Sequence, residues 1–102
     1  MLKGKTAVVT GGSRGIGAAV VKKLASLGAD VAVVYAGNAE KAGEVCEECR
    51  NEFGVRAESY CCDVSDFSAV KELASMIKKD FGTVNILVNN AGITRDGLVA
   101  VM

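Results

Sequence analysis

Short β-rich segments alternate with amphipathic helical segments along this chain, and a glycine follows each helical segment. The three glycines, Gly28, Gly54 and Gly82, stand 26 and 28 residues apart, which leaves room for a strand, a helix and two short loops. A chain that alternates strands and helices in this way folds as an α/β domain around a parallel sheet. With 102 residues, the chain is long enough for one such domain and too short for two.

Four segments are predicted to be strands, namely residues 6–10, 31–35, 56–61 and 85–89. The first, second and fourth are continuous apolar runs, which is typical of parallel strands that are covered on both faces. The prediction is a doubly wound parallel sheet of Rossmann type with the strand order 3-2-1-4. With this order, right-handed crossovers place the first two helices on one face of the sheet and the third helix alone on the other.

Three helices are predicted, one over about residues 16–27, one between Asn38 and Gly54, and one between Ser65 and Gly82. Asn38 and Ser65 are the expected N-caps, because their side-chain oxygens can accept hydrogen bonds from the first turn. Helical periodicity predicts the buried faces. These are Ile16, Val20, Leu24 and Leu27 in the first helix, Ala42, Val45, Cys49 and Phe53 in the second, and Val70, Leu73, Ile77 and Phe81 in the third.

The composition argues against several classes of protein. Twelve Lys and Arg balance twelve Asp and Glu without blocks of like charge, so no basic surface for nucleic acid is predicted. The first five residues do not resemble a signal peptide, and no apolar run approaches the ~18 residues that a membrane span needs. A cytoplasmic protein, or one in a soluble organelle lumen, is expected.

The four cysteines admit two interpretations. A zinc site would need ligand spacing, which the adjacent Cys61 and Cys62 lack, and the chain has no histidine. Cys46 and Cys49 stand three residues apart within a predicted helix. The preferred interpretation is therefore small buried apolar side chains in a reduced compartment, and no metal site is predicted.

The segment between the first strand and the first helix is rich in glycine, and residues 10–17 read TGGSRGIG. Gly11 permits a tight turn out of the strand, Gly15 removes a side chain where a backbone must approach a pyrophosphate, and Gly17 lets the helix pack closely on the sheet. Phosphates would then lie at the helix N-terminus, where free N–H groups favour an anion. The candidate cofactor-binding residues of this loop are Gly11, Ser13, Arg14, Gly15, Ile16 and Gly17.

The G-x-x-x-G-x-G spacing from Gly11 resembles the short-chain dehydrogenase/reductase family. Cys62-Asp63-Val64, after the third strand, resembles that family's D-V element, which implies that the Asp63 carboxylate receives the adenine amino group. The alternative is that Asp63 belongs to a helix N-cap beside Ser65. Asn89-Asn90-Ala91-Gly92 resembles the N-N-A-G signature, which implies that Asn89 steadies the central strands and that the backbone at Ala91 and Gly92 passes the ribose on the nicotinamide side.

The end of the second strand predicts which dinucleotide is bound. An NAD enzyme usually has an acidic residue there to hold the ribose 2′-hydroxyl, but this chain has Tyr35. Asp30 precedes the strand and should point away from the crevice. Arg14 can meet a 2′-phosphate with a charge-assisted hydrogen bond, and Asn38 can add a donor at a helix start. The predicted cofactor is NADP(H).

Within the family, residues 12–17 together with residues 90–96 look most like the bacterial and plastid 3-oxoacyl-[acyl-carrier-protein] reductases. The continuation Ile93-Thr94-Arg95-Asp96 discriminates best, although acetoacetyl-CoA reductases share it. This resemblance implies that NADPH reduces a β-keto thioester, carried by acyl-carrier protein or CoA, in fatty-acid biosynthesis. It also implies a homo-oligomer, typically a tetramer.

The resemblance further implies a catalytic Asn, a Ser and a Tyr-x-x-x-Lys pair beyond the N-N-A-G strand. Neither Tyr35 nor Tyr60 has a lysine four residues later, so no catalytic residue is assigned. Residues 1–102 are therefore expected to be an NADP(H)-binding half that is incomplete at its C-terminus and inactive alone. The alternatives are a non-catalytic nucleotide-binding half that needs a partner chain, or, less favoured, another Rossmann-like binder such as a methyltransferase.

Overall fold

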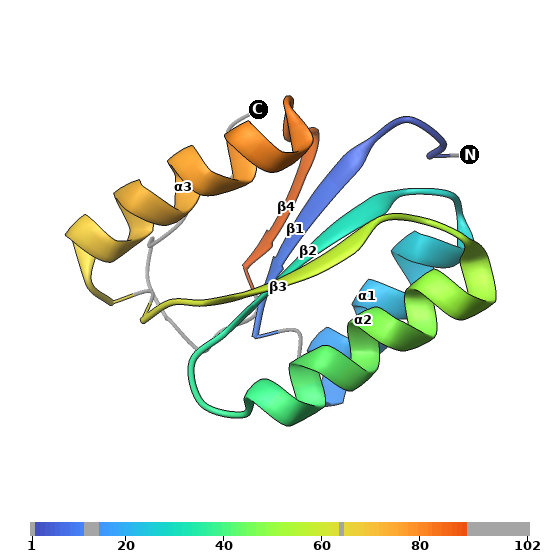
Figure 1. The fold of residues 1–102 in the computed structure, drawn as a ribbon, viewed down its shortest axis with the longest axis horizontal. Coiled ribbons are helices and arrows are strands. Elements are labelled where there is room, and N and C mark those ends of the chain that lie inside the picture. Colours follow the sequence, from blue (N-terminus) through green and yellow to red (C-terminus); the bar gives the residue numbers. More distant parts are fainter. Residues whose placement is uncertain (1, 12–14, 64, 90–102) are drawn as a thin grey trace.

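The computed structural model describes residues 2–11, 15–63 and 65–89, and strands alternate with helices throughout this part (Figure 1). All strand pairs are parallel, and the sheet has the order β3-β2-β1-β4. The predicted doubly wound sheet with strand order 3-2-1-4 is thus confirmed. In chain order the elements are β1 (Thr6–Thr10), α1 (Gly15–Ser26), β2 (Asp30–Tyr35), α2 (Ala39–Phe53), β3 (Ala57–Cys61), α3 (Phe67–Phe81) and β4 (Ile86–Asn89).

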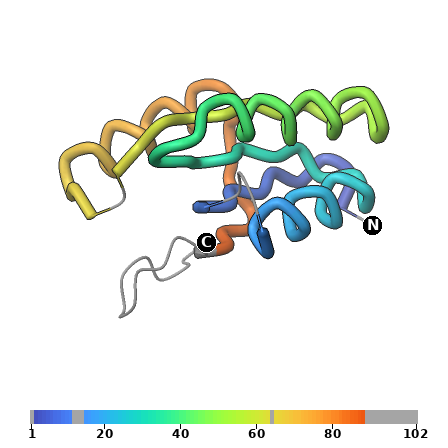
Figure 2. Tube along the Cα trace, turned by 90° about the horizontal axis from the view of Figure 1, so that it is seen from below, coloured from blue at the N-terminus to red at the C-terminus, as the bar shows by residue number. Residues whose placement is uncertain are grey.

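The helices form two layers, one on each face of the sheet. Figures 1 and 2 show α1 and α2 together on one face and α3 on the other, as the right-handed crossovers predict. Val9 and Val33 are fully buried against α1 and α2, while Val8 and Val34 are buried in the cluster of α3. Because alternate residues of β1 and β2 face different helices, every position in these strands needs an apolar or small side chain.

The buried face of α1 differs from the predicted one. Its buried residues are Gly17, Val21 and Ala25, whereas Ile16 is 75% exposed. Val20 and Leu24 are only partly buried against the core. The prediction was wrong by one position because it followed the large apolar side chains, while small residues lie nearest the sheet and let the helix approach it closely.

Helix α2 begins and ends as predicted. The Asn38 side-chain oxygen accepts a hydrogen bond from the Lys41 N–H at 3.0 Å, and the Gly54 N–H donates to the Arg50 carbonyl. Three of the four residues of the predicted inner face are buried, and Phe53 is 37% exposed at the end of the helix. The additional buried residue is Cys46.

The N-cap of α3 is Asp66 rather than Ser65, which corrects the sequence prediction. The Asp66 carboxylate accepts a hydrogen bond from the Ala69 N–H at 3.2 Å. Ser65 is already engaged, since both its N–H and its hydroxyl donate to Asp63. On the predicted inner face, Leu73 and Ile77 are buried, with Val70 and Phe81 partly buried beside them.

Cys46, Cys49 and Cys62 are buried among apolar side chains, as expected, but Cys61 is exposed at the end of β3. Cys61 follows Tyr60 on an edge strand, where the next side chain points away from α3, so the expectation of burial was wrong for this one cysteine. Among the residues described, no helix has both the length and the apolar character of a membrane span.

Candidate functional site

The strand ends bring the predicted site residues to one edge of the sheet. Thr10, the last residue of β1, is in register with Asn89 of β4 and with Val34 of β2, and Tyr35 is in register with Cys61. The chain crosses from β1 to β2 on one side and reaches β4 on the other, so the strand order reverses beside β1. In open α/β sheets, ligands bind in the crevice at such a switch point.

The glycine loop leaves β1 and enters α1 at this edge. Gly11 and Gly15 have φ angles of 67° and 63°, in the left-handed region that residues other than glycine rarely adopt. A Cβ atom built on Gly15 would meet no heavy atom within 4 Å, so open space lies where the loop turns into the helix. Gly17 is buried in the first turn of α1, as expected of a residue that lets this helix pack closely on the sheet.

This geometry fits a pyrophosphate group. Helix α1 begins at Gly15, so its first N–H groups, which lack partners within the helix, and the positive end of its dipole lie at this end of the glycine loop. A side chain at Gly15 would intrude there, and Ile16 lies beside it, 75% exposed. Ser13 and Arg14 lie outside the described residues.

Thr10 adds a contact that sequence reasoning missed. Its side chain is buried, and its hydroxyl donates to the Val88 carbonyl of β4 at 3.4 Å. This bond links β1 to β4 immediately before the glycine loop. A threonine that ends a buried apolar strand is the signal that could have indicated it, since a buried hydroxyl needs an acceptor.

At the end of β2, Tyr35 is half-buried against the α1 and α2 side of the core. Asn38 uses its side-chain oxygen to cap α2, which leaves its amide NH₂ as the group that can donate to a ligand. Asp30 lies at the opposite end of β2, where its carboxylate accepts a hydrogen bond from the Arg56 N–H at 2.9 Å. The prediction that Asp30 points away from the crevice is confirmed.

Beyond β3, Asp63 is exposed and its carboxylate accepts hydrogen bonds from the Ser65 hydroxyl at 2.6 Å and the Ser65 N–H at 3.0 Å. These bonds lower the pKa of Asp63, so the group is an anion and an acceptor at neutral pH. Asp63 does not cap α3, because Asp66 does. Cys62 is buried beside α3, and its burial raises the pKa of its thiol.

The remaining candidate residues are Asn89, Val64, Ala91 and Gly92. Asn89 ends β4 in register with Thr10, next to the glycine loop. Val64, Ala91 and Gly92 lie outside the described residues. The described candidates therefore come together from the ends of all four strands, and the loop at Gly11 is joined to β2 by a hydrogen bond from its N–H to the Val34 carbonyl at 2.8 Å.

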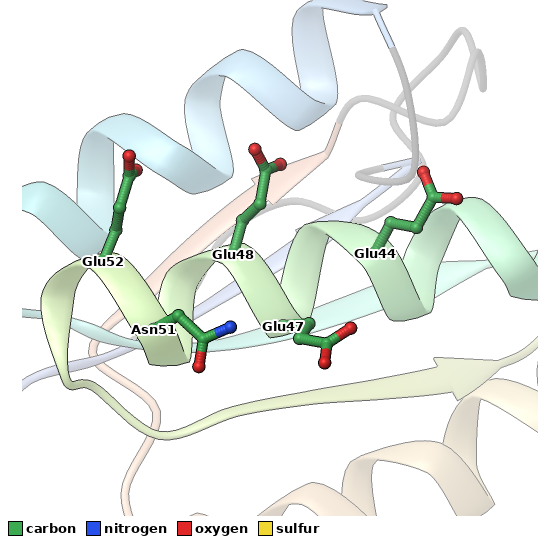
Figure 3. A pocket seen from close by; sticks show the side chains of 5 residues that line it. All are labelled: Glu44, Glu47, Glu48, Asn51 and Glu52. Carbon is green, nitrogen blue, oxygen red and sulfur yellow. The ribbon is translucent and has the colours of Figure 1, made fainter.

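A separate hollow lies on α2, away from the strand ends (Figure 3). Glu44, Glu48 and Glu52 point toward α1, and Glu48 forms an ion pair with Lys22 of α1 at 2.9 Å. Glu47 and Asn51 complete the lining. Of the four carboxylates, Glu48 pairs with Lys22 and Glu44 pairs with Lys41, and the negative charge that remains repels a phosphate, so this hollow is not a nucleotide site.

Comparison with known proteins extends these observations. The family model for short chain dehydrogenases matches residues 5–102. A 3-oxoacyl-[acyl-carrier-protein] reductase of Staphylococcus aureus (strain Mu50) is 46% identical over 95 residues, which cover 93% of this chain and 38% of that protein. A sorbose reductase of Candida albicans is 47% identical over 92 residues, which cover 90% of this chain and 32% of that protein.

Solved structures match as well. A short-chain dehydrogenase from Burkholderia cenocepacia in complex with NADP superposes with a TM-score of 0.86 at 49% identity, covering 94% of this chain and 39% of that one. An NAD⁺-bound xylitol dehydrogenase superposes with a TM-score of 0.84 at 37% identity, covering 90% of this chain and 35% of that one. The chain spans about a third of the length of the curated relatives it matches.

Proposed function

This chain belongs to the short-chain dehydrogenase family, and from that premise we propose that it is the NADPH-binding part of a 3-oxoacyl-[acyl-carrier-protein] reductase. The observation that carries the cofactor assignment is the conformation of Gly11 and Gly15. Both glycines have a left-handed backbone, and the Cβ position of Gly15, at the start of α1, has no heavy atom within 4 Å. Bound there, NADPH supplies the hydride. The residues of this chain hold its phosphates, ribose and adenine.

The choice of NADP(H) over NAD(H) rests on Tyr35, Asn38 and Arg14. No carboxylate follows β2 where an NAD enzyme would hold the 2′-hydroxyl, and the Asn38 amide is available as a donor. The Burkholderia relative, the more similar of the two solved structures, was determined with NADP, which supports the choice. The arginine in the loop supplies the positive charge that a 2′-phosphate requires.

A titration with both dinucleotides tests this choice. Arg14→Ala should weaken NADPH binding by about tenfold or more, since a charge-assisted hydrogen bond to the 2′-phosphate is lost. The affinity for NADH should change little. Binding is measured from the fluorescence of the reduced nicotinamide, with the exposed Lys71→Ala on α3 as a control for loss of a surface positive charge. Equal losses for the two dinucleotides would contradict the assignment.

The substrate is proposed from a shorter stretch of sequence. The reductase of S. aureus and the sorbose reductase of C. albicans are 46% and 47% identical to this chain, so overall identity does not choose between them. The Ile93-Thr94-Arg95-Asp96 continuation favours the β-keto thioester reductase. The second candidate is therefore a ketose reductase, which the C. albicans relative supports.

An activity assay separates the two candidates. The complete reading frame that contains this segment should oxidise NADPH with acetoacetyl-CoA and leave L-sorbose unreduced, whereas the opposite result would favour the ketose reductase. The 102-residue chain alone should show no turnover, because neither of its two tyrosines begins the Tyr-x-x-x-Lys pair that the resemblance implies for the reaction. Measurable turnover by the short chain would refute that statement.

The complete protein is proposed to share the substrate carrier, the oligomeric state and the location of 3-oxoacyl-[acyl-carrier-protein] reductases. The complete protein would take its substrate from acyl-carrier protein or CoA, assemble as a homo-oligomer and work in the cytoplasm. A reading frame that continues into Ser and Tyr-x-x-x-Lys would support a catalytic protein. A reading frame that stops at Met102 would favour the alternative of a nucleotide-binding half that acts with a partner chain.

A further inference from the structure

Asn85, directly before β4, makes two hydrogen bonds to one residue of the central strand. The Thr6 N–H donates to the Asn85 side-chain oxygen at 2.9 Å, and the Asn85 N–H donates to the Thr6 carbonyl at 2.9 Å. The side chain of Asn85 thus extends the pairing of β1 and β4 by one step beyond the first residue of β4. Asn85 lies at the edge of the sheet opposite the nucleotide site.

The Thr6 N–H depends on this side chain. Thr6 is only 4% exposed, so its backbone donor has little access to water, and an unsatisfied buried donor is costly. The Asn85 oxygen reaches that donor in only one alignment of the two strands. In this alignment Ala7 pairs with Ile86, and the register continues to the pair of Thr10 and Asn89.

The alignment matters because β4 pairs only with β1 in the described sheet. A slip by one residue would move the strand by ~3.3 Å and turn each side chain to the other face of the sheet. Ile86 and Val88 now pack on the side of α1 and α2, and Leu87 packs on the side of α3. The slip would also carry Asn89 away from Thr10 and the glycine loop.

We propose that Asn85 is a positioning residue for the nucleotide site, because its side chain sets the register of β4 and so places Asn89 beside the glycine loop. The role rests on the proposed function, since the site it serves is the proposed NADPH site. Within the described residues, the hydrogen bonds of Asn85 go to Thr6, which is not among the residues assigned to the cofactor. It acts through the four register pairs between β1 and β4.

Two substitutions at this position test whether the side-chain oxygen is needed. Asn85→Ala removes the acceptor, whereas Asn85→Asp keeps an oxygen in the same place. Hydrogen exchange at the Thr6 amide, measured on the purified protein by NMR, should accelerate by about tenfold or more in Asn85→Ala and by less than about twofold in Asn85→Asp. NADPH affinity should fall by about tenfold in Asn85→Ala and be retained by Asn85→Asp.

Ile77→Val in α3 serves as the control for general loss of stability, because Ile77 is buried among apolar side chains and has no polar side-chain atom that could bond to Thr6 or Asn85. It should lower the melting temperature without changing Thr6 exchange or NADPH affinity. Unchanged NADPH affinity in Asn85→Ala, with faster Thr6 exchange, would overturn the positioning role alone. Failure of the unsubstituted protein to bind NADPH would refute the proposed function and, with it, this role.

Discussion

Two glycines, one at each edge of the sheet, allow stability and cofactor binding to be perturbed separately. Gly15 has φ 63°, and a Cβ atom there would meet nothing within 4 Å. Gly28 has φ 102°, and a Cβ atom there would lie 3.1 Å from the Lys3 nitrogen and 3.2 Å from its Cα. Alanine at either position is strained, but only alanine at Gly28 would also press on a neighbouring backbone, which would have to shift by a few tenths of an ångström.

The magnitudes follow from these contacts. In Gly15→Ala the cost is that of a left-handed alanine, about 1–2 kcal/mol, partly offset by a more restricted unfolded chain. In Gly28→Ala the strained backbone costs about 1–3 kcal/mol, and displacement of the Lys3 segment adds to it. For a domain of this size, each kcal/mol lowers the melting temperature by roughly 4–8 °C. Gly28→Ala should therefore have the lower melting temperature.

Cofactor binding should show the reverse order. The methyl group in Gly15→Ala enters the space proposed for the pyrophosphate, so NADPH affinity should fall by about tenfold or more. Gly28→Ala, measured below its melting temperature, should bind NADPH as the unsubstituted protein does. Melting is followed by circular dichroism and binding by nicotinamide fluorescence. Unchanged NADPH affinity in Gly15→Ala would refute the placement of the phosphates, and equal melting temperatures would refute the argument from close approach at Gly28.

Three further predictions follow from side chains with defined partners. Tyr60 donates its hydroxyl to Asp80 at 2.6 Å, so Tyr60→Phe should cost about 1 kcal/mol in urea unfolding at pH 8. Burial and the bond to Asp80 raise the pKa of Tyr60, so its contribution is complete below about pH 10 and is lost as pH rises further; parallel alkaline unfolding curves for the two proteins would contradict this. Asp66→Ala should cost about 1 kcal/mol as a lost N-cap and leave NADPH binding unchanged, whereas Asp63→Ala should weaken NADPH binding and leave α3 intact. The opposite pattern in melting and titration would assign the cap to Asp63. Under native conditions a thiol reagent should alkylate Cys61 alone, because the other three cysteines are buried and burial raises the pKa of Cys46 to about 11; mass spectrometry that finds labelled Cys46 in the folded protein would disprove this.

The sequence pattern predicted most of the fold because that information is local. Continuous apolar runs indicated parallel strands, and Asn38 and Gly54 marked both ends of α2. Two errors came from competition between neighbours. Ser65 and Asp66 are both good N-caps, and Asp66 caps α3 because the helix begins at Phe67, so that Asp66 directly precedes it. At α1 the small residues, rather than the large ones, lie against the sheet.

The candidate site was predicted as a list of segments, and its assembly depended on the sheet. Cys62 and Asn89 were named from their resemblance to motifs of the short-chain family, and strand direction implies that the ends of parallel strands meet at one edge of the sheet. The links between strands could not be predicted. The bond from the Thr10 hydroxyl to Val88 and the pair of bonds between Asn85 and Thr6 join residues nearly eighty positions apart.

The amino-acid sequence by itself determined the alternation of strands and helices and the glycine loop, because these depend on periodicity or on the conformational range of single residues. The tertiary structure decided which side chains face the sheet, which polar groups cap α3 and how β4 is held on β1. These depend on which donors and acceptors the fold brings within hydrogen-bonding distance and on how closely two backbones approach. The glycine loop consists of eight adjacent residues, but its position beside Asn89 depends on contacts across the whole sheet.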